Sequence, residues 1–372
     1  MREFRVPVVV YLVGFLVVGL SLSLLGPSLT DLRGRSGSGI GGIGVLFAGQ
    51  SLGYIIGSIV GGRLYDRLDG HRVLALAFTA LALGLAVMPT FHSVVGFSVA
   101  FAIIGGGAGA ADVGANTMLM WELQASSGRA MNMLHMCFGL GALSAPLAVH
   151  ASLDASVRGA AAAGVGIAMW LWVVPAPTAP TAARDEHAPH TRPMLVVLAT
   201  FFFLYVGVEV GFAGWIHTYG EEVRFSRLAA TWLTTVFWAG FTLGRLLASA
   251  LGHRFRPKVL LTGSCSLTLL AAIVLIVGDG RTGAVWAGAA MMGVATAPQF
   301  PVMLIHLERH IQVSGGATAW FVAAAGLGGL IFPWLIGQWF DAKGASTLPW
   351  AILVLALATL SSFVVSNRRL AR

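Results

Sequence analysis

Charged residues are scarce in this sequence and make up only 10% of its 372 residues. A soluble globular protein carries about 25% charged residues, so an ordinary soluble enzyme is excluded. Cysteine is rarer still. Only Cys137 and Cys265 occur, both in apolar runs, which excludes a disulfide scaffold and favours two buried thiols. Because hydrophobic residues reach 57%, a disordered chain is also excluded.

Lysine is nearly absent, since only Lys258 and Lys343 occur, and the net charge of +8 comes almost entirely from arginine. No basic stripe or aromatic-interleaved patch accompanies this charge, which argues against nucleic-acid binding. The ten histidines show no HExxH or Cys/His spacing that would predict a metal site. The Gly-rich run 105–109 lies inside an apolar stretch with no phosphate-loop context. We expect neither an enzyme nor a cofactor or metal.

Apolar runs long enough to cross a bilayer, about 20 residues each, recur along the whole sequence. Glycine, at 48 residues, is nearly twice as common as usual, which suits close contact between helices in a bilayer. We predict an all-α membrane protein with twelve transmembrane helices in two pseudo-symmetric six-helix bundles. The predicted spans are 6–30, 40–62, 73–91, 93–119, 131–151, 158–175, 194–217, 228–251, 259–277, 282–305, 315–339 and 348–366.

The distribution of Arg and Lys over the short loops predicts the orientation of these spans. With the N-terminus inside, the cytoplasmic segments hold 15 basic residues and the outer segments hold 7, while Arg245 falls inside a span. We therefore predict a multi-pass protein of the cell (inner) membrane with both termini in the cytoplasm. The basic surplus is then a signal for membrane topology.

A Pro-rich polar stretch at the midpoint divides the chain into two halves. We predict an N-terminal bundle at 1–175, an extended cytoplasmic linker at 176–193 and a C-terminal bundle at 194–372. The halves resemble each other, because the Gly-x-x-x-Gly run 53–57 recurs as 240–244, an offset of 187 residues. Such duplication is typical of transporters built from two six-span bundles around a central site.

The loop between the second and third predicted spans carries a recognisable pattern. It reads Gly62-Arg-Leu-Tyr-Asp66-Arg67-Leu-Asp-Gly70-His-Arg72 and resembles the loop signature of the major facilitator superfamily. That signature has one residue between the Asp-Arg pair and the next Gly, whereas this loop has two, Leu68 and Asp69. The resemblance covers the whole chain and implies the major facilitator fold.

Four further stretches resemble the fucose–galactose–hexose symporters and the sodium-dependent glucose transporter-like proteins of that superfamily. They are Asp112-Val-Gly-Ala-Asn116, Leu134-His135 with Phe138-Gly-Leu-Gly-Ala142, Tyr205-Val-Gly-Val-Glu209 with Trp215 and Tyr219, and Pro333-Trp-Leu-Ile-Gly337-Gln338. Some of those symporters use an acid in the first span, and residues 6–29 contain none. The resemblance implies a secondary active transporter that imports a sugar or related polar small molecule by proton- or sodium-coupled symport and alternating access.

The same resemblance implies a gating role for Asp66, Arg67 and Arg72, whose charge pairs would hold the halves together on the cytoplasmic face. Ion pairs that form in one conformation and break in another bias a two-state equilibrium. Arg245 lies in the matching region of the eighth span. It can pair with an acid across the bundle or snorkel toward the cytoplasm, and we favour a gating role.

Two carboxyl groups lie well inside predicted spans, where a charge costs about 3 kcal/mol and therefore indicates a function. Asp112 has Asn116 one turn further on the same helical face, so the pair can hold sugar hydroxyls, accept a proton or contribute to a sodium site. A protonated Asp112 bonded across a helix interface is the alternative. The neighbours of Glu209 are mostly valines, a setting suited to holding a proton. We predict that both carboxyls couple the ion and that Asp112 also binds substrate.

Other polar and aromatic side chains are weaker candidates for the substrate site. Trp215 and Tyr219 can stack on a sugar ring, although an interfacial aromatic belt explains them equally well. Asn132 and His135 share one face at the start of the fifth span, where His135 can bind substrate, relay a proton or simply pack.

Gln299 lies between Pro298 and Phe300-Pro301 in the tenth span, 187 residues after Asp112. Helix broken by proline near the midplane leaves backbone groups that substrate or ions often satisfy, so Gln299 is a candidate contact. Trp320 is a further candidate, although a lone Trp more often packs.

Two other functions stay open. A proton-driven exporter of drugs or metabolites would share the loop signature, and residues 139–146 loosely resemble the Gly/Pro motif of exporters. A membrane receptor or scaffold would show no substrate-dependent flux. For the favoured transporter, we expect a monomer whose partners are a sugar-like substrate, a coupling ion (H⁺ or Na⁺) and the lipid bilayer.

Overall fold

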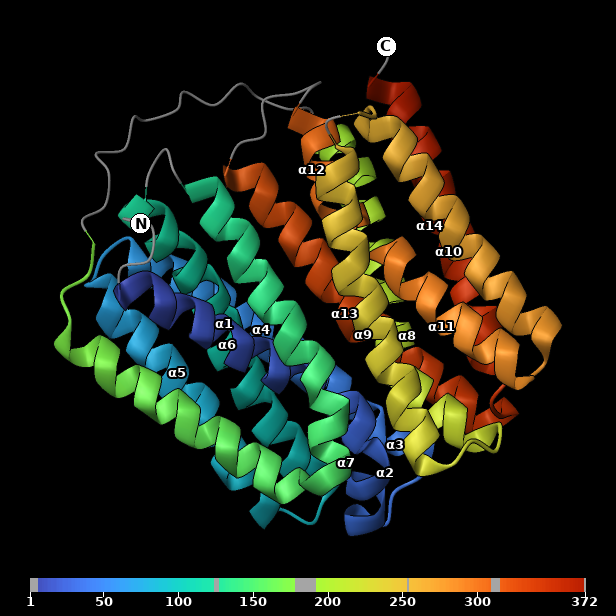
Figure 1. Ribbon diagram of the computed structural model, residues 1–372, viewed down its shortest axis with the longest axis horizontal. Helices are drawn as coiled ribbons and strands as arrows, with labels where there is room; N and C mark the ends of the chain where they lie inside the picture. Colours follow the sequence, from blue (N-terminus) through green and yellow to red (C-terminus); the bar gives the residue numbers. More distant parts are fainter. Residues whose placement is uncertain (1–5, 124–126, 178–191, 253, 309–314, 371–372) are drawn as a thin grey trace. The chain divides into compact units, whose positions relative to one another are not determined.

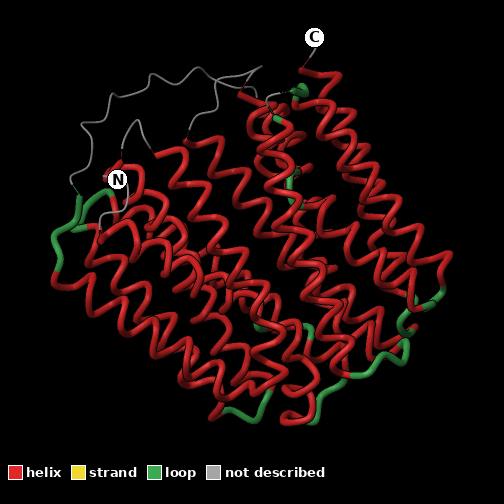
Figure 2. The backbone as a smooth tube through the Cα atoms, in the orientation of Figure 1, coloured by secondary structure: helices red, strands yellow, loops and turns green. Residues whose placement is uncertain are grey.

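The computed structural model describes residues 6–123, 127–177, 192–252, 254–308 and 315–370. Two compact units divide the chain, Met1–Ala183 and Arg184–Arg372. Most of the predicted linker, 176–193, lies outside the described residues, so its boundaries and those of the two predicted bundles stay predictions. In the described parts the chain is helical with short connecting loops (Figure 2).

The first unit contains seven α-helices and one short 3₁₀ helix among its described residues (Figure 1). They are α1 (Val6–Ser23), α2 (Leu25–Ser36), α3 (Ile40–Ile43), α4 (Val45–Tyr65), α5 (Gly70–Val87), η1 (Met88–Thr90), α6 (Val94–Leu123) and α7 (Ser127–Val173). The helices pack as pairs, with α4 on α6, α1 on α7, and α5 on both α6 and α7.

The second unit contains seven described helices. They are α8 (Arg192–Glu222), α9 (Arg227–Leu251), α10 (Pro257–Gly278), α11 (Thr282–Thr296), α12 (Gln299–Glu308), α13 (Gly315–Lys343) and α14 (Thr347–Leu370). Here α8 packs on α13 and α14, α9 on α11, and α10 on α11. Stacked aromatic side chains fill the core beside α8, for example Phe202 and Phe321, whose ring centroids are 5.0 Å apart.

Ten stretches of the described chain are long and apolar enough to cross a membrane. One of them, Ala130–Val173, has 44 residues and would be about 66 Å long as a straight helix, twice the hydrocarbon thickness. It bends at Ser152, where φ is −171° and ψ is 115°. The Ser156 hydroxyl donates to the Ala148 carbonyl at 2.7 Å across this bend. This stretch therefore accounts for the fifth and sixth predicted spans.

The eighth predicted span is α9, whose 25 residues are long enough to cross the bilayer, although threonines and Arg245 make it less apolar than the other spans. With this helix and the divided α7, all twelve predicted spans are helical. The prediction of an all-α membrane protein with twelve spans in two six-helix bundles is confirmed.

Two spans are interrupted by proline. The sequence predicts one continuous span at 6–30, and this is wrong in detail, because α1 ends at Ser23 and α2 begins at Leu25. The cause is Pro27, whose ring clashes with the carbonyl of the residue four positions earlier, Ser23. In the tenth span, the predicted break at Pro298 is present, since α11 ends at Thr296 and α12 begins at Gln299.

Candidate functional site

Asp112 is half-buried in α6 and is held by two neighbours. Its Oδ1 accepts a hydrogen bond from Nδ2 of Asn116 at 2.8 Å, which places the two side chains on one face of the helix. Its Oδ2 accepts a hydrogen bond from the hydroxyl of Tyr54 on α4. These two donors fix the orientation of the carboxyl group.

Close packing of α4 on α6 brings Tyr54 to Asp112. A Cβ atom added at Gly53 would overlap the carbonyl oxygen of Ala102, and one added at Gly109 would overlap that of Tyr54. Small residues let helix backbones approach within a bilayer, where packing rather than the hydrophobic effect joins helices. The Gly-rich run in α6 therefore allows the close approach of α4 that brings Tyr54 to the Asp112 carboxyl.

Glu209 is half-buried in α8 and accepts a hydrogen bond from the hydroxyl of Tyr205, one turn earlier on the same helix. The positive charge of Arg245 on α9 acts on both side chains. The guanidinium group of Arg245 lies over the ring of Phe241, with Cζ 4.6 Å from the ring centroid, a cation–π arrangement. Of the two alternatives for Arg245, pairing with an acid across the bundle or snorkelling toward the cytoplasm, neither is decided by this contact, and its gating role stays a prediction.

Arg245 also carries an unused donor. Its Nε is buried and has no hydrogen-bond partner among the described residues. A buried donor without an acceptor costs about 1–3 kcal/mol. A ligand oxygen or ion-bound water at this position would remove that cost.

Each unit thus places one carboxyl group next to a tyrosine hydroxyl inside a span. In the first unit the tyrosine comes from a neighbouring helix, and in the second it comes from the preceding turn. The second carboxyl, Glu209, also has the cationic side chain of Arg245 near it. Tyr54 was not among the residues singled out from the sequence, although it stands in the repeated Gly-x-x-x-Gly run.

The side-chain amide of Gln299 hydrogen-bonds to other protein groups and does not face an open cavity. It is 2% exposed, and its Nε2 donates to Oγ1 of Thr268 at 2.8 Å and to the carbonyl of Ala295 at 3.1 Å. Ala295 is four residues earlier, so this side chain caps a carbonyl at the proline break between α11 and α12. The predicted need to satisfy backbone at the break is therefore met by Gln299 itself.

The two aromatic candidates of α8 are buried within their own unit. Trp215 is fully buried, and its Nε1 donates to the carbonyl of Pro333 at 2.8 Å. Its ring stacks on Phe340, with centroids 5.8 Å apart. Trp215 thereby joins α8 to α13. Tyr219 is buried about 15 Å further along the helix than Glu209. We leave both aromatics out of the proposed site.

The remaining substrate candidates do not gather around either carboxyl in the described contacts. Asn132 is exposed. His135 is half-buried and meets the ring of Phe15 edge to face, with centroids 5.6 Å apart. Trp320 is 66% exposed in the second turn of α13.

The loop signature follows the end of α4. Asp66, Arg67 and Arg72 are all exposed there. The extra residue of this loop has a structural role, because Asp69 caps α5 by accepting a hydrogen bond from the backbone N–H of Arg72 at 3.0 Å. The gating role stays a prediction.

Comparison with known proteins gives the family. The family model of the Major Facilitator Superfamily matches residues 11–333, most of the chain. The chain belongs to the Major Facilitator Superfamily. It is therefore a multi-pass membrane transporter and not an enzyme, which confirms the predicted resemblance.

Curated relatives point to the same branch of the superfamily. Sodium-dependent glucose transporter 1 of Danio rerio is 26% identical over 87% of this chain, and the matched part is 62% of that protein. Sodium-dependent glucose transporter 1A of Mus musculus is 25% identical, with 87% of each chain covered. This chain therefore spans less than two thirds of the zebrafish protein.

Solved structures share the fold. A variant of the nucleoside transporter NupG matches with a TM-score of 0.79 at 14% identity, over 98% of this chain and 99% of that chain. The xylose transporter XylE from E. coli, in a partially occluded inward-open conformation, matches with a TM-score of 0.77 at 15% identity, over 97% and 98%. At such low identity these matches show the major facilitator fold alone.

Proposed function

We propose that this transporter imports a sugar or related polar small molecule by cation-coupled symport in the cell membrane, with both termini in the cytoplasm, and that it works as a monomer. The observation that carries the proposal is the half-buried carboxyl–tyrosine pair inside a span of each unit, Asp112 with Tyr54 and Glu209 with Tyr205. The relatives named sodium-dependent glucose transporters support the substrate class and a coupling cation.

Asp112 is proposed as a substrate ligand. Its carboxyl already accepts two hydrogen bonds, from Tyr54 and Asn116, and a carboxylate has about four acceptor positions. A sugar hydroxyl can donate to this carboxylate, and the side-chain oxygen of Asn116 can accept from another hydroxyl, because it is Nδ2 that donates to Asp112. Clustered carboxyl, amide and phenol groups favour a polyhydroxylated substrate over an apolar one.

Glu209 is proposed as the coupling residue. Arg245 on the neighbouring helix is close enough for its charge to act on this carboxyl, so protonation or cation binding at Glu209 would weaken the attraction between the two side chains. Arg245, with its buried Nε lacking a described partner, could then bind an acceptor elsewhere. Such a change between two discrete arrangements gives ion binding a way to bias the conformational equilibrium.

Symport then follows from linkage between two binding events. If the ion favours the conformation that binds substrate, the substrate favours ion binding by the same factor. In this fold, alternating access turns that coupling into net movement across the membrane. No covalent chemistry is needed.

Uptake by purified protein in proteoliposomes tests the proposal. Vesicles with an imposed proton gradient, an imposed sodium gradient or neither are supplied with a panel of radiolabelled hexoses, pentoses and polyols. Gradient-dependent accumulation of one of these compounds is the expected result. Accumulation of a hydrophobic dye driven by a proton gradient, with no sugar uptake, would instead identify an exporter.

A further inference from the structure

An apolar groove lies between α13 and α14, on the surface of the second unit. It has a volume of about 500 Å³, within the range of about 300–1,000 Å³ typical of ligand sites. Its walls include the large side chains of Phe332, Trp339, Trp350 and Val354. Trp339, Trp350 and Val354 are each about half exposed or more, so the groove is open to the surroundings of the helices.

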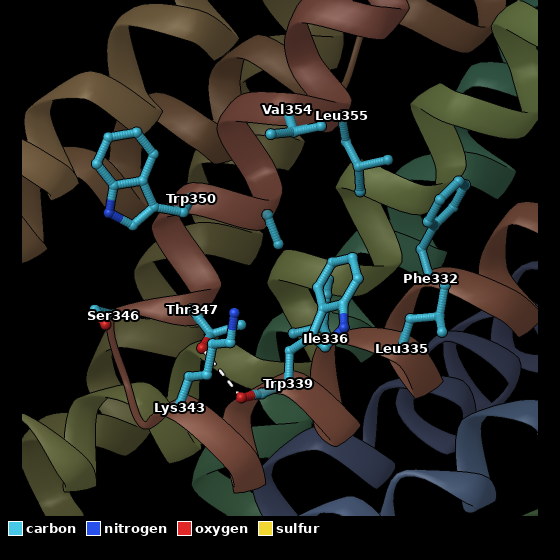
Figure 3. A pocket seen from close by; sticks show the side chains of 11 residues that line it. Phe332, Leu335, Ile336, Trp339, Lys343, Ser346, Thr347, Trp350, Val354 and Leu355 are labelled. Atoms are coloured by element: carbon cyan, nitrogen blue, oxygen red, sulfur yellow. Dashed lines mark hydrogen bonds between the residues drawn. The ribbon is translucent and has the colours of Figure 1, made fainter.

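The two ends of the groove differ in chemistry. Figure 3 shows Lys343, Ser346 and Thr347 at one end and Val354 and Leu355 at the other. Lys343 is exposed in the last turn of α13, and Ser346 and Thr347 stand at the beginning of α14. The positive end of the α14 dipole adds to the charge of Lys343. One end is therefore suited to an anion and the other to a hydrocarbon chain.

The two tryptophans stand between these ends. Trp339 lies one turn before Lys343 on α13, and Trp350 lies one turn after Ser346 on α14. Trp is enriched where the hydrocarbon region of a bilayer meets the headgroups. Its presence on both walls, next to the cationic end, places that end of the groove at headgroup depth.

We propose that this groove binds an anionic glycerophospholipid. The phosphate would contact the ammonium group of Lys343 and the hydroxyl of Ser346, while the Thr347 hydroxyl donates to the Trp339 carbonyl at 3.2 Å and joins the two helices. The glycerol would lie between Trp339 and Trp350, and one acyl chain would lie along the apolar wall. A free phosphate ion would gain nothing from that wall, and a zwitterionic lipid would bring a second cation to Lys343.

The chain offers a matched control for the charge. Its only other lysine is Lys258, which is also exposed and lies in the first turn of α10, away from the groove. Lys343→Gln and Lys258→Gln remove the same charge from the same residue type. A basic residue near a membrane surface contributes a factor of roughly fivefold to anionic lipid binding.

The experiment is a titration of the delipidated full-length protein in detergent, followed by native mass spectrometry. The probes are dioleoyl phosphatidylglycerol and dioleoyl phosphatidylcholine. We expect wild-type protein to retain phosphatidylglycerol preferentially, Lys343→Gln to lose this preference by about fivefold, and Lys258→Gln to keep it. Equal melting temperatures of the variants in lipid-free detergent exclude a folding defect.

Cross-linking locates the bound lipid. A phosphatidylglycerol with a photoactivatable acyl chain should label peptides from 332–355 in wild-type protein, and less so in Lys343→Gln. Equal retention of both lipids by wild-type protein, equal losses in the two lysine variants, or adducts confined to other helices would each overturn the proposal.

Discussion

Glu209→Gln is the sharpest test of the proposed coupling mechanism. The amide keeps the size of the side chain and an oxygen that can accept from the Tyr205 hydroxyl. It removes the negative charge on which Arg245 acts. The variant therefore reproduces a permanently neutralised Glu209, with the surrounding packing unchanged.

The size of the effect follows from the driving force. A membrane potential of 100 mV is worth about 2.3 kcal/mol per charge, and about 1.4 kcal/mol corresponds to a factor of ten. A carrier that moves one cation with each neutral substrate can thus concentrate the substrate up to about 50-fold. In Glu209→Gln this ratio should fall to about one, whereas exchange of substrate down its own gradient should continue.

The assay compares two measurements on the same proteoliposomes, gradient-driven accumulation and counterflow exchange. Glu222→Gln is the matched control, because Glu222 is exposed at the end of the same helix. Its accumulation should equal that of wild-type protein. If Glu209→Gln still concentrates substrate against its gradient, Glu209 is not the coupling residue and Asp112 takes over that role.

Variants at Asp112, at Asp66 and in the linker test the remaining proposals. Asp112→Asn should weaken substrate binding by roughly tenfold or more, because a hydrogen bond to a charged group is worth about 1.5–3 kcal/mol; an unchanged dissociation constant in calorimetry would contradict this. Asp66→Asn should favour the inward-open state, because it removes charge pairs of the other state, and spin-label distances equal to wild type would count against it. Cysteines placed in 176–192 should react with impermeant reagents only from the cytoplasmic side; labelling from outside intact cells would reverse the topology.

The helices of this fold follow from local sequence, because each span must bury its own backbone hydrogen bonds and needs about 20 apolar residues. The break at Pro298 could be predicted for the same local reason. The break at Leu24 was missed, although Pro27 is equally visible in the sequence. There the proline lies inside an apolar run long enough for one continuous span, and the clash between its ring and the carbonyl four residues earlier still breaks the helix.

The contacts of the candidate site were predictable only within one helix. Asn116 is one turn after Asp112, and the hydrogen bond between them follows from helical spacing. Tyr54 reaches the same carboxyl from α4, and its position depends on the register of two helices separated by 58 residues in sequence. The glycines of α4 and α6 that allow this close packing are visible in the sequence. The sequence does not show that these two helices pack on each other.

Gln299 shows why position alone is a weak guide to substrate contacts. Its place at a proline break, and its offset from Asp112, suggested a group that faces a ligand. A side-chain amide at such a break has two possible uses, since it can bind a ligand or replace the missing backbone hydrogen bond. The deciding partner is Thr268 on α10, which accepts from Nε2 at 2.8 Å and fixes the amide in its buried position. By contrast, Arg245 keeps a buried donor without a described partner. A ligand or ion therefore has more to gain at Arg245 and Glu209 than at Gln299.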